Sequence, residues 1–264
     1  FDVVNAGLTA SICDGVHSSG KNIPIIFSSS TQDDFVNAYG KSKLDDETAL
    51  KALEVVTSCP IYIYRLPGVF GKWCKPNYNS VVATFCHNIA HGLPLQISDE
   101  NTSLRLVYID DVVASIQEVL ESSQRGVNYN AVETEYAITV GNLSTQIKAF
   151  NNCRTSLLSE KVGVGLVRAL YATYISYLPC EDFSYKIPSH GDERGVFVEM
   201  LKTPDAGQFS YFTAHPGVTR GGHYHHTKTE KFLVIKGDAK FGFRHIVTNE
   251  RCTMPHMGQM CFSL

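Results

Sequence analysis

Two hydrophobic periods alternate along the first two thirds of the chain. Short, almost continuous apolar runs are typical of strands buried on both faces of a parallel sheet, and the segments between them have helical spacing. This alternation predicts an α/β, Rossmann-like parallel sheet that helices cover on both sides. The expected strands are residues 1–6, 22–29, 60–65 and 105–108, and the expected helices are residues 38–53, 80–89 and 110–122.

An apolar stripe runs along the helix expected at residues 38–53. Leu44, Ala49, Leu50 and Leu53 recur at the spacing of one helical face, and the acidic residues fall on the opposite face. We therefore expect these four side chains to pack against the sheet and the carboxylates to face solvent.

The pattern stays helical from about residue 143 to residue 178 and changes after Pro179. Beyond that point short β-rich segments are separated by Gly, Pro and Asp, which is typical of an all-β barrel or sandwich. We expect two domains, residues 1–178 and residues 179–264. The expected strands of the second are residues 195–201, 207–215, 231–235 and 239–244.

Composition narrows the class of protein. A chain of 264 residues is long enough for about two domains. The formal net charge of −3 leaves no basic surface of the kind that binds nucleic acid, and no apolar run approaches the roughly 18 residues that a membrane span needs. Eight scattered cysteines without a C-x-x-C pair are typical of free thiols in a reducing cytoplasm.

Candidate redox chemistry lies at the start of the second expected helix. Tyr39 and Lys43 are four residues apart, so they share one helical face, and the ammonium can stabilise the ionised form of the phenol. The hydroxyl could then exchange a proton with a substrate oxygen, held by a serine of the run Ser28-Ser29-Ser30. This set is suited to hydride transfer between a nicotinamide and a carbonyl. A Y-x-x-x-K alone also fits an ordinary solvated helix.

Candidate metal chemistry lies in the segment from Gly217 to Gly237, which reads G-x5-H-x-H-x4-E-x6-G. On a strand, His223 and His225 would point to one face, and Glu230 could return on the neighbouring strand. Two imidazoles and one carboxylate form a catalytic rather than a structural ligand set for a small divalent metal such as zinc. A histidine-rich surface hairpin is the alternative.

These motifs resemble two known families. The pattern F-S-S-S…Y-G-K-S-K looks like the extended short-chain dehydrogenase/reductases, which act on nucleotide-linked sugars. By that resemblance Ser30 would be the catalytic serine beside Tyr39 and Lys43, and Asn5, Ala6 and Gly7 would help to bind the cofactor. The histidine segment resembles the first motif of the cupins, whose fold is an all-β barrel.

The order of the two domains, with the segment from Phe70 to Ser80, resembles one family more narrowly. It is the bifunctional capsular-polysaccharide enzyme that fuses such a reductase to a C-terminal cupin, on the route to UDP-N-acetyl-L-fucosamine. The resemblance implies a zinc cupin that epimerises C3 of a UDP-2-acetamido-2,6-dideoxy-4-ketohexose. It also implies an NADPH-dependent reductase that gives a UDP-N-acetyl-L-talosamine-type product, and a homodimer formed through the cupin.

The loop after the third expected strand offers a site for the sugar nucleotide. Lys72, Lys75, Asn77 and Asn79 could contact its diphosphate, although a solvated basic loop fits as well.

Two expected parts of that family have no counterpart in the chain. No glycine-rich pyrophosphate turn is present, so the Rossmann sheet is expected to lack its first strands, and a second cupin motif would fall beyond Leu264. The tail, residues 251–264, does not resemble the family. A truncated, non-catalytic relative that acts as a metal-binding or oligomerising cupin module is therefore the alternative function.

Overall fold

The computed structural model describes residues 5–31, 38–122, 124–257 and 261–263. The chain forms two compact units. The first runs to Asp192 and includes Val196–Thr213, and the second comprises Glu193–Gly195 and the residues from Ala214 onward. The domain boundary expected after residue 178 stays a prediction.

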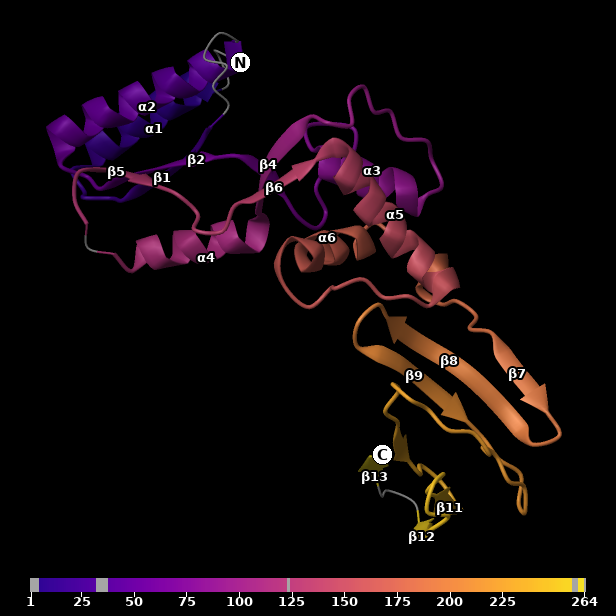
Figure 1. Cartoon of the computed structure of the whole chain (residues 1–264). Helices are drawn as coiled ribbons and strands as arrows, with labels where there is room; N and C mark the ends of the chain where they lie inside the picture. The colour runs from indigo at the N-terminus through magenta and orange to yellow at the C-terminus, as the bar shows by residue number, and fades with distance from the viewer. Residues whose placement is uncertain (1–4, 32–37, 123, 258–260, 264) are drawn as a thin grey trace. The chain divides into compact units, whose positions relative to one another are not determined.

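The first unit contains a three-stranded parallel sheet with the strand order β1-β2-β5. Helices α1 and α2 cover one of its faces and α4 covers the other (Figure 1). These elements are β1 (Ile25–Ser30), β2 (Ile61–Leu66), β5 (Val127–Asn130), α1 (Asn5–Ser19), α2 (Ala38–Thr57) and α4 (Ile109–Leu120).

Alternating side chains of β2 hold the three layers together. Ile61 and Ile63 are buried with Leu50 of α2, whereas Tyr62 and Tyr64 are buried with Val119 of α4. A central parallel strand buried on both faces is what the uninterrupted apolar run of β2 predicts. The Rossmann-like α/β parallel sheet is therefore confirmed.

A second, mixed sheet continues the first unit, with β3 parallel and β6 antiparallel to β4. Its main core cluster includes Phe150, Leu170 and Tyr174, which come from the two helices that follow the sheet. The elements are β3 (Gly68–Phe70), β4 (Ser103–Tyr108), β6 (Tyr136–Thr139), α3 (Val81–Ala90), α5 (Val140–Ser156) and α6 (Gly165–Ile175).

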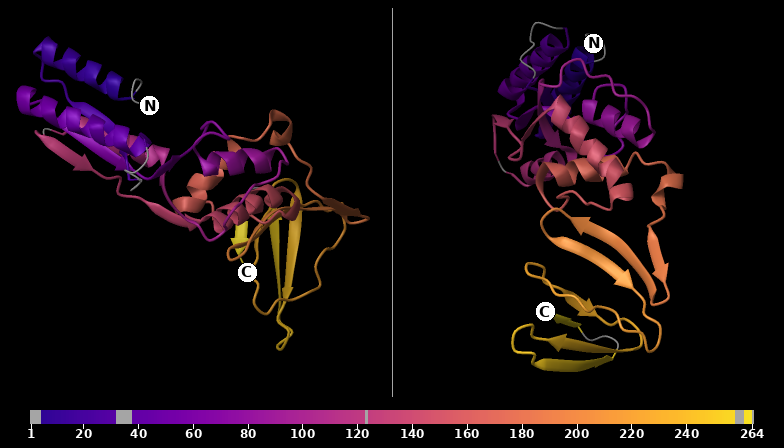
Figure 2. Two further views of the ribbon diagram at one scale, coloured as in Figure 1. Left: turned by 90° about the horizontal axis from the view of Figure 1, so that it is seen from above. Right: turned by 45° about the vertical axis from the view of Figure 1, so that its right-hand side comes forward.

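The β-rich region follows a 3-10 turn and forms three small sheets. Strands β7, β8 and β9 lie side by side in the first unit (Figure 2), and in the second unit β10 pairs with β13 and β11 with β12. Within the described ranges these sheets do not close a barrel, so the expected cupin barrel is not shown. The elements are η1 (Cys180–Phe183), β7 (Ser189–Asp192), β8 (Gly195–Thr203), β9 (Gly207–Phe212), β10 (Lys231–Leu233), β11 (Asp238–Arg244), β12 (Arg251–Met257) and β13 (Cys261–Ser263).

The beginning of the chain differs from the sequence prediction. Residues 1–4 of the strand expected at residues 1–6 lie outside the described part, and Asn5 already begins α1. The helix packs on the core of the parallel sheet through the half-buried Cys13, whereas Leu8 and Ile12 are exposed.

The inner face of α2 also differs from the prediction. Leu44 is 39% exposed, whereas Asp46 and Glu47 are 2% and 1% exposed. The apolar stripe therefore begins later than expected, at Leu50, and carboxylates take the buried positions before it. Glu47 can be buried there because polar groups of the sheet satisfy it, as described below.

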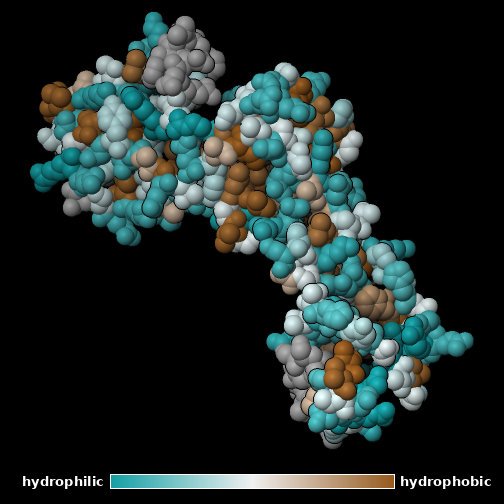
Figure 3. All heavy atoms as spheres, viewed as in Figure 1, coloured by the Kyte–Doolittle hydropathy of each residue, from teal (hydrophilic) through white to brown (hydrophobic). Residues whose placement is uncertain are grey.

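The outer surface is mixed in polarity. On the face seen in Figure 3, hydrophilic residues surround small hydrophobic patches. None of the helices in the part of the chain described here is long and apolar enough to cross a membrane. The cysteines whose side chains are described are all free thiols, as predicted.

Candidate functional site

The predicted redox residues meet where β1 ends and α2 begins. The Lys43 ammonium donates a hydrogen bond to the Ser28 carbonyl oxygen at 3.0 Å. The same Nζ atom lies 4.7 Å from the ring centroid of Phe27 and 5.9 Å from that of Tyr39. The four-residue spacing thus brings Tyr39 and Lys43 to one helical face beside the serine run. Their catalytic roles, and that of Ser30, stay predictions.

A buried polar network lies one helical turn beyond Lys43. Glu47 Oε1 accepts hydrogen bonds from Ser29 Oγ at 2.7 Å and Arg65 Nε at 3.0 Å. Its Oε2 accepts from Arg65 Nη2 at 2.7 Å and the Tyr129 hydroxyl at 3.2 Å. One carboxylate of α2 is therefore joined to all three strands of the parallel sheet. Sequence reasoning missed this network, although Glu47 continues the spacing of four that links Tyr39 to Lys43.

Burial and hydrogen bonding act in opposite directions on the Glu47 carboxyl. Burial alone would raise its pKa, but the bonds from Arg65, Ser29 and Tyr129, with the Arg65 charge, lower the pKa below its ordinary value. The pairing in turn raises the pKa of Arg65. Glu47 is therefore ionised at neutral pH although its side chain is buried.

This network predicts a pH-dependent stability. Because the folded-state pKa of Glu47 is lowered, its contribution is present above the unfolded value of about 4.3 and is lost as pH falls through the folded pKa. Glu47→Gln should lower the free energy of unfolding at pH 7 by roughly 1–3 kcal/mol. Water around the half-exposed Arg65 side chain limits that cost.

Urea unfolding followed by circular dichroism at several pH values measures the effect. The difference between the parent chain and Glu47→Gln should be constant above about pH 5 and should shrink below about pH 4. A difference that stays the same down to the most acidic pH would contradict this assignment.

The predicted substrate-binding residues lie in an exposed loop between β3 and α3. Lys72, Lys75, Asn77 and Asn79 are exposed. The Lys75 ammonium lies 5.5 Å from the Tyr78 ring centroid, and the Asn77 amide N–H donates to Thr84 Oγ1 at 2.9 Å. The structure thus gives these residues contacts within the loop and with α3, and their binding role stays a prediction.

A close approach fixes the start of this loop. A Cβ atom added to Gly71 would lie 2.2 Å from Ile109 Cγ2, at the beginning of α4. Only glycine fits there without a shift of α4, so the loop leaves β3 along a defined path.

The predicted cofactor residues at the beginning of the chain lie on a helix. Asn5, Ala6 and Gly7 form the first turn of α1 rather than a strand end. Gly7 is exposed, and the side chains of the other two lie outside the described set. Their role in cofactor binding stays a prediction.

The predicted metal ligands converge in the second unit. Ligand atoms of His223, His225 and Glu230 all lie within 4.8 Å of one another. The two imidazole centroids are 4.9 Å apart, and His225 Nε2 lies 3.5 Å from Glu230 Oε1. The chemistry of this donor set, two imidazoles and one carboxylate, fits a zinc ion.

The backbone that carries these ligands is not the one predicted. His223 and His225 lie in the loop between β9 and β10 rather than on a strand, so alternation along a strand does not place them. Positive φ angles at Gly217, Gly221 and Gly222 turn the chain instead.

A neighbouring cation acts on the carboxylate of this cluster. The Lys228 ammonium lies 2.8 Å from Glu230 Oε1, and this hydrogen bond is the largest influence that lowers the pKa of Glu230. The carboxylate is therefore ionised and ready to bind a cation, and Lys228 must give up its bond if a metal takes that oxygen.

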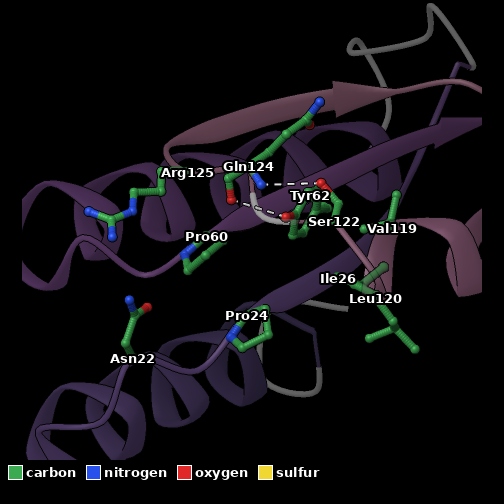
Figure 4. A pocket seen from close by; sticks show the side chains of 10 residues that line it. All are labelled: Asn22, Pro24, Ile26, Pro60, Tyr62, Val119, Leu120, Ser122, Gln124 and Arg125. Carbon is green, nitrogen blue, oxygen red and sulfur yellow. Dashed lines mark hydrogen bonds between the residues drawn. The ribbon is translucent and has the colours of Figure 1, made fainter.

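A cavity of about 180 Å³ lies in the first unit. Figure 4 shows its lining, in which Pro24 immediately precedes β1, Ile26 lies at the beginning of β1 and Leu120 lies at the end of α4. Because β1 ends at Ser30, this cavity is at the opposite end of the strand from Lys43. It therefore plays no part in the candidate redox site.

Comparisons with known proteins identify the class of each part. Residues 6–133 match the NAD dependent epimerase/dehydratase family, and residues 190–262 match the polysaccharide biosynthesis C-terminal domain. The first part therefore resembles epimerase/dehydratase domains and the second resembles C-terminal domains of polysaccharide biosynthesis. The second match includes residues 251–262, so the expectation that the tail does not resemble the family is wrong.

A curated relative and a solved structure narrow the class. The chain is 54% identical over 256 residues to the UDP-2-acetamido-2,6-beta-L-arabino-hexul-4-ose reductase of Pseudomonas aeruginosa. The aligned residues make up 96% of this chain and 69% of the relative. It is 39% identical to the capsular polysaccharide assembling protein CapF of Staphylococcus aureus, with a TM-score of 0.88 over 97% of this chain and 70% of that one. The chain belongs to this family of sugar-nucleotide enzymes.

A more distant structure agrees on the fold alone. The UDP-glucose 4-epimerase of Thermotoga maritima is 19% identical, with a TM-score of 0.54 over 64% of this chain and 67% of that one. The likeness supports the Rossmann-like architecture of the first unit.

Proposed function

We propose that the protein acts on a UDP-linked 2-acetamido-2,6-dideoxy-4-ketohexose in capsular polysaccharide biosynthesis. Its first domain would reduce the C4 ketone with NADPH, and its second would epimerise C3, giving a UDP-N-acetyl-L-talosamine-type product. The observation that carries the proposal is the 54% identity to the Pseudomonas aeruginosa reductase. The convergence of Tyr39 and Lys43 at the end of β1 supports it.

In the reductase step, each predicted residue acts on the ketone oxygen or on its proton donor. Tyr39 would give its phenolic proton to the C4 oxygen, and Ser30 would donate a hydrogen bond that holds that oxygen. The Lys43 ammonium, close to the Tyr39 ring, would stabilise the phenolate that is left. NADPH supplies the hydride when it is bound, and Asn5, Ala6, Gly7, Tyr39 and Lys43 would help to hold it.

In the epimerase step, His223, His225 and Glu230 would hold zinc. Their ligand atoms lie within 4.8 Å of one another, so the side chains would draw closer to reach the roughly 2 Å distances of zinc ligands. Bound zinc supplies a Lewis acid that polarises the ketone, which makes the proton on the neighbouring carbon removable.

The loop residues Lys72, Lys75, Asn77 and Asn79 would contact the diphosphate of the sugar nucleotide, since amide and ammonium groups donate to phosphate oxygens.

Two measurements on the purified chain test the two steps. Incubation with the 4-keto sugar nucleotide and NADPH should consume NADPH and give a product heavier by two hydrogen atoms. With zinc but no NADPH in deuterated water, one deuterium should enter the sugar at C3. If neither change occurs at saturating cofactor and metal, the proposed activity is wrong for this chain.

A metal-binding module without catalysis is the second candidate. It is favoured by one observation: the cluster of possible metal ligands is formed wholly within the second unit. In that case the chain would bind zinc and form a homodimer through its C-terminal domain. Zinc binding without NADPH consumption or deuterium uptake would select this candidate.

A further inference from the structure

We infer that Glu47 is a positioning residue for the reductase site, which it serves by fixing α2 against the sheet. The inference rests on the proposed function, because it assigns Glu47 to the reaction of Tyr39 and Lys43. It concerns a residue whose own side chain faces the strands and not the substrate.

The first step is the placement of Glu47 along α2. Tyr39, Lys43 and Glu47 follow one another at intervals of four residues, so they lie on one face of the helix over two turns. The Lys43 ammonium reaches the Ser28 carbonyl, and the Glu47 carboxylate reaches Ser29 on the next residue of β1. Successive turns of α2 are thus bound to successive residues of one strand.

The second step is the number of strands that Glu47 joins. Its two oxygens accept from Ser29 of β1, from both Nε and Nη2 of Arg65 of β2, and from Tyr129 of β5. The bonds from Arg65 are bidentate, which fixes orientation as well as distance. Sliding or rotating α2 would break bonds to three strands at once, so the helix has one favoured register on the sheet.

The third step is the need for a carboxylate at this position. All of its partners are donors, and an ionised carboxylate is the side chain that only accepts. A glutamine of the same shape would present its NH₂ group to one of these donors. Glu47 and Ser29 are 1% and 8% exposed, so a polar group left unpaired between them is costly, whereas water can still reach Arg65 and Tyr129.

The consequence for the reaction is geometric. The position of the Tyr39 hydroxyl depends on the register of α2, and a displacement of about 1 Å at a reacting group can lower the rate by roughly 10²-fold. Glu47 therefore affects kcat through the position of α2. The affinity for the sugar nucleotide depends on other parts of the site.

The test compares Glu47→Gln with the matched control Asp45→Asn, whose carboxylate is exposed on the same helix. Glu47→Gln should lower kcat for NADPH-dependent ketone reduction by roughly 10- to 100-fold with KM changed less than about threefold. Ser29→Ala and Tyr129→Phe each remove one bond and should give smaller losses of kcat. Asp45→Asn should match the parent chain.

A second readout does not depend on activity. Acetylation by acetic anhydride, followed by mass spectrometry, reports how far the Lys43 amine is held at Ser28. Its rate should rise about fivefold or more in Glu47→Gln, while that of Lys41, exposed on the same helix, stays constant. If Glu47→Gln does not fold, the smaller Ser29→Ala and Tyr129→Phe changes provide the same comparison.

The outcomes separate a failure of the inference about Glu47 from a failure of the proposed function. Unchanged kcat and unchanged Lys43 acetylation in folded variants would overturn the inference, as would an effect confined to KM. If the parent chain reduces no ketone, the proposed function is wrong. The acetylation ratio then still decides whether Glu47 fixes Lys43 against β1.

Discussion

Replacing Tyr39 by phenylalanine should lower kcat for ketone reduction by roughly 10²–10⁴-fold, the usual contribution of a positioned acid. The change removes one hydroxyl and keeps the ring, which lies near the Lys43 ammonium. The helix and its network through Glu47 should persist, because the described hydrogen bonds of Glu47 come from Ser29, Arg65 and Tyr129. The loss should therefore be chemical rather than structural.

Steady-state consumption of NADPH with the 4-keto sugar nucleotide measures this effect. Tyr211→Phe is the matched control, since it removes an exposed hydroxyl from β9 and should leave kcat unchanged. Equal kcat in Tyr39→Phe and the parent chain would contradict the role of Tyr39 as proton donor. Deuterium uptake at C3 should be the same in all three proteins, because the metal ligands lie in the other unit.

Replacing His223 by alanine should weaken zinc binding by at least about 100-fold. Changes to the outer partners of metal ligands already cost roughly 10–100-fold, and His223 would be a direct ligand in a set of only three. Deuterium uptake at C3 should disappear with the metal. Reduction of a ketone that does not need epimerisation should continue, since Tyr39 and Lys43 are untouched.

Competition with a chromophoric chelator measures the zinc dissociation constant. His226→Ala is the matched control, because His226 belongs to the same exposed loop and contacts Tyr224 rather than the three ligands. Zinc affinities that are equal in His223→Ala and the parent chain would contradict the assigned site.

The sequence predicts the longer elements of the fold well. The apolar run of β2 and the helix that follows Ser80 are found within one or two residues of the expected bounds, and Ser80 accepts a hydrogen bond from the Ala83 N–H as an N-cap. Strands of three or four residues, such as β3 and β6, were missed. Runs that short carry too few positions to show a period.

The functional roles of the candidate site residues stay predictions, and the structure differs from the sequence prediction in what surrounds them. The spacing of His223, His225 and Glu230 predicts a ligand cluster, and the three side chains do lie together, but on a loop rather than on strands. Glycine conformation, which turns this loop, is not visible in a hydrophobic pattern. Likewise, helical spacing finds Tyr39 and Lys43 but treats Glu47 as a surface charge. Its burial depends on Arg65 and Tyr129, which are remote in sequence.

The network around Glu47 also has a consequence for the order of folding. Its acceptor and its last donor, Tyr129, are 82 residues apart, with β2 and α4 between them in the chain. Tyr129 lies on β5, which pairs with β2, so this bond to the acid on α2 needs β5 in its place in the sheet. Closing such a long loop is slow compared with forming a helix. The full set of hydrogen bonds of this one carboxylate therefore requires the finished parallel sheet.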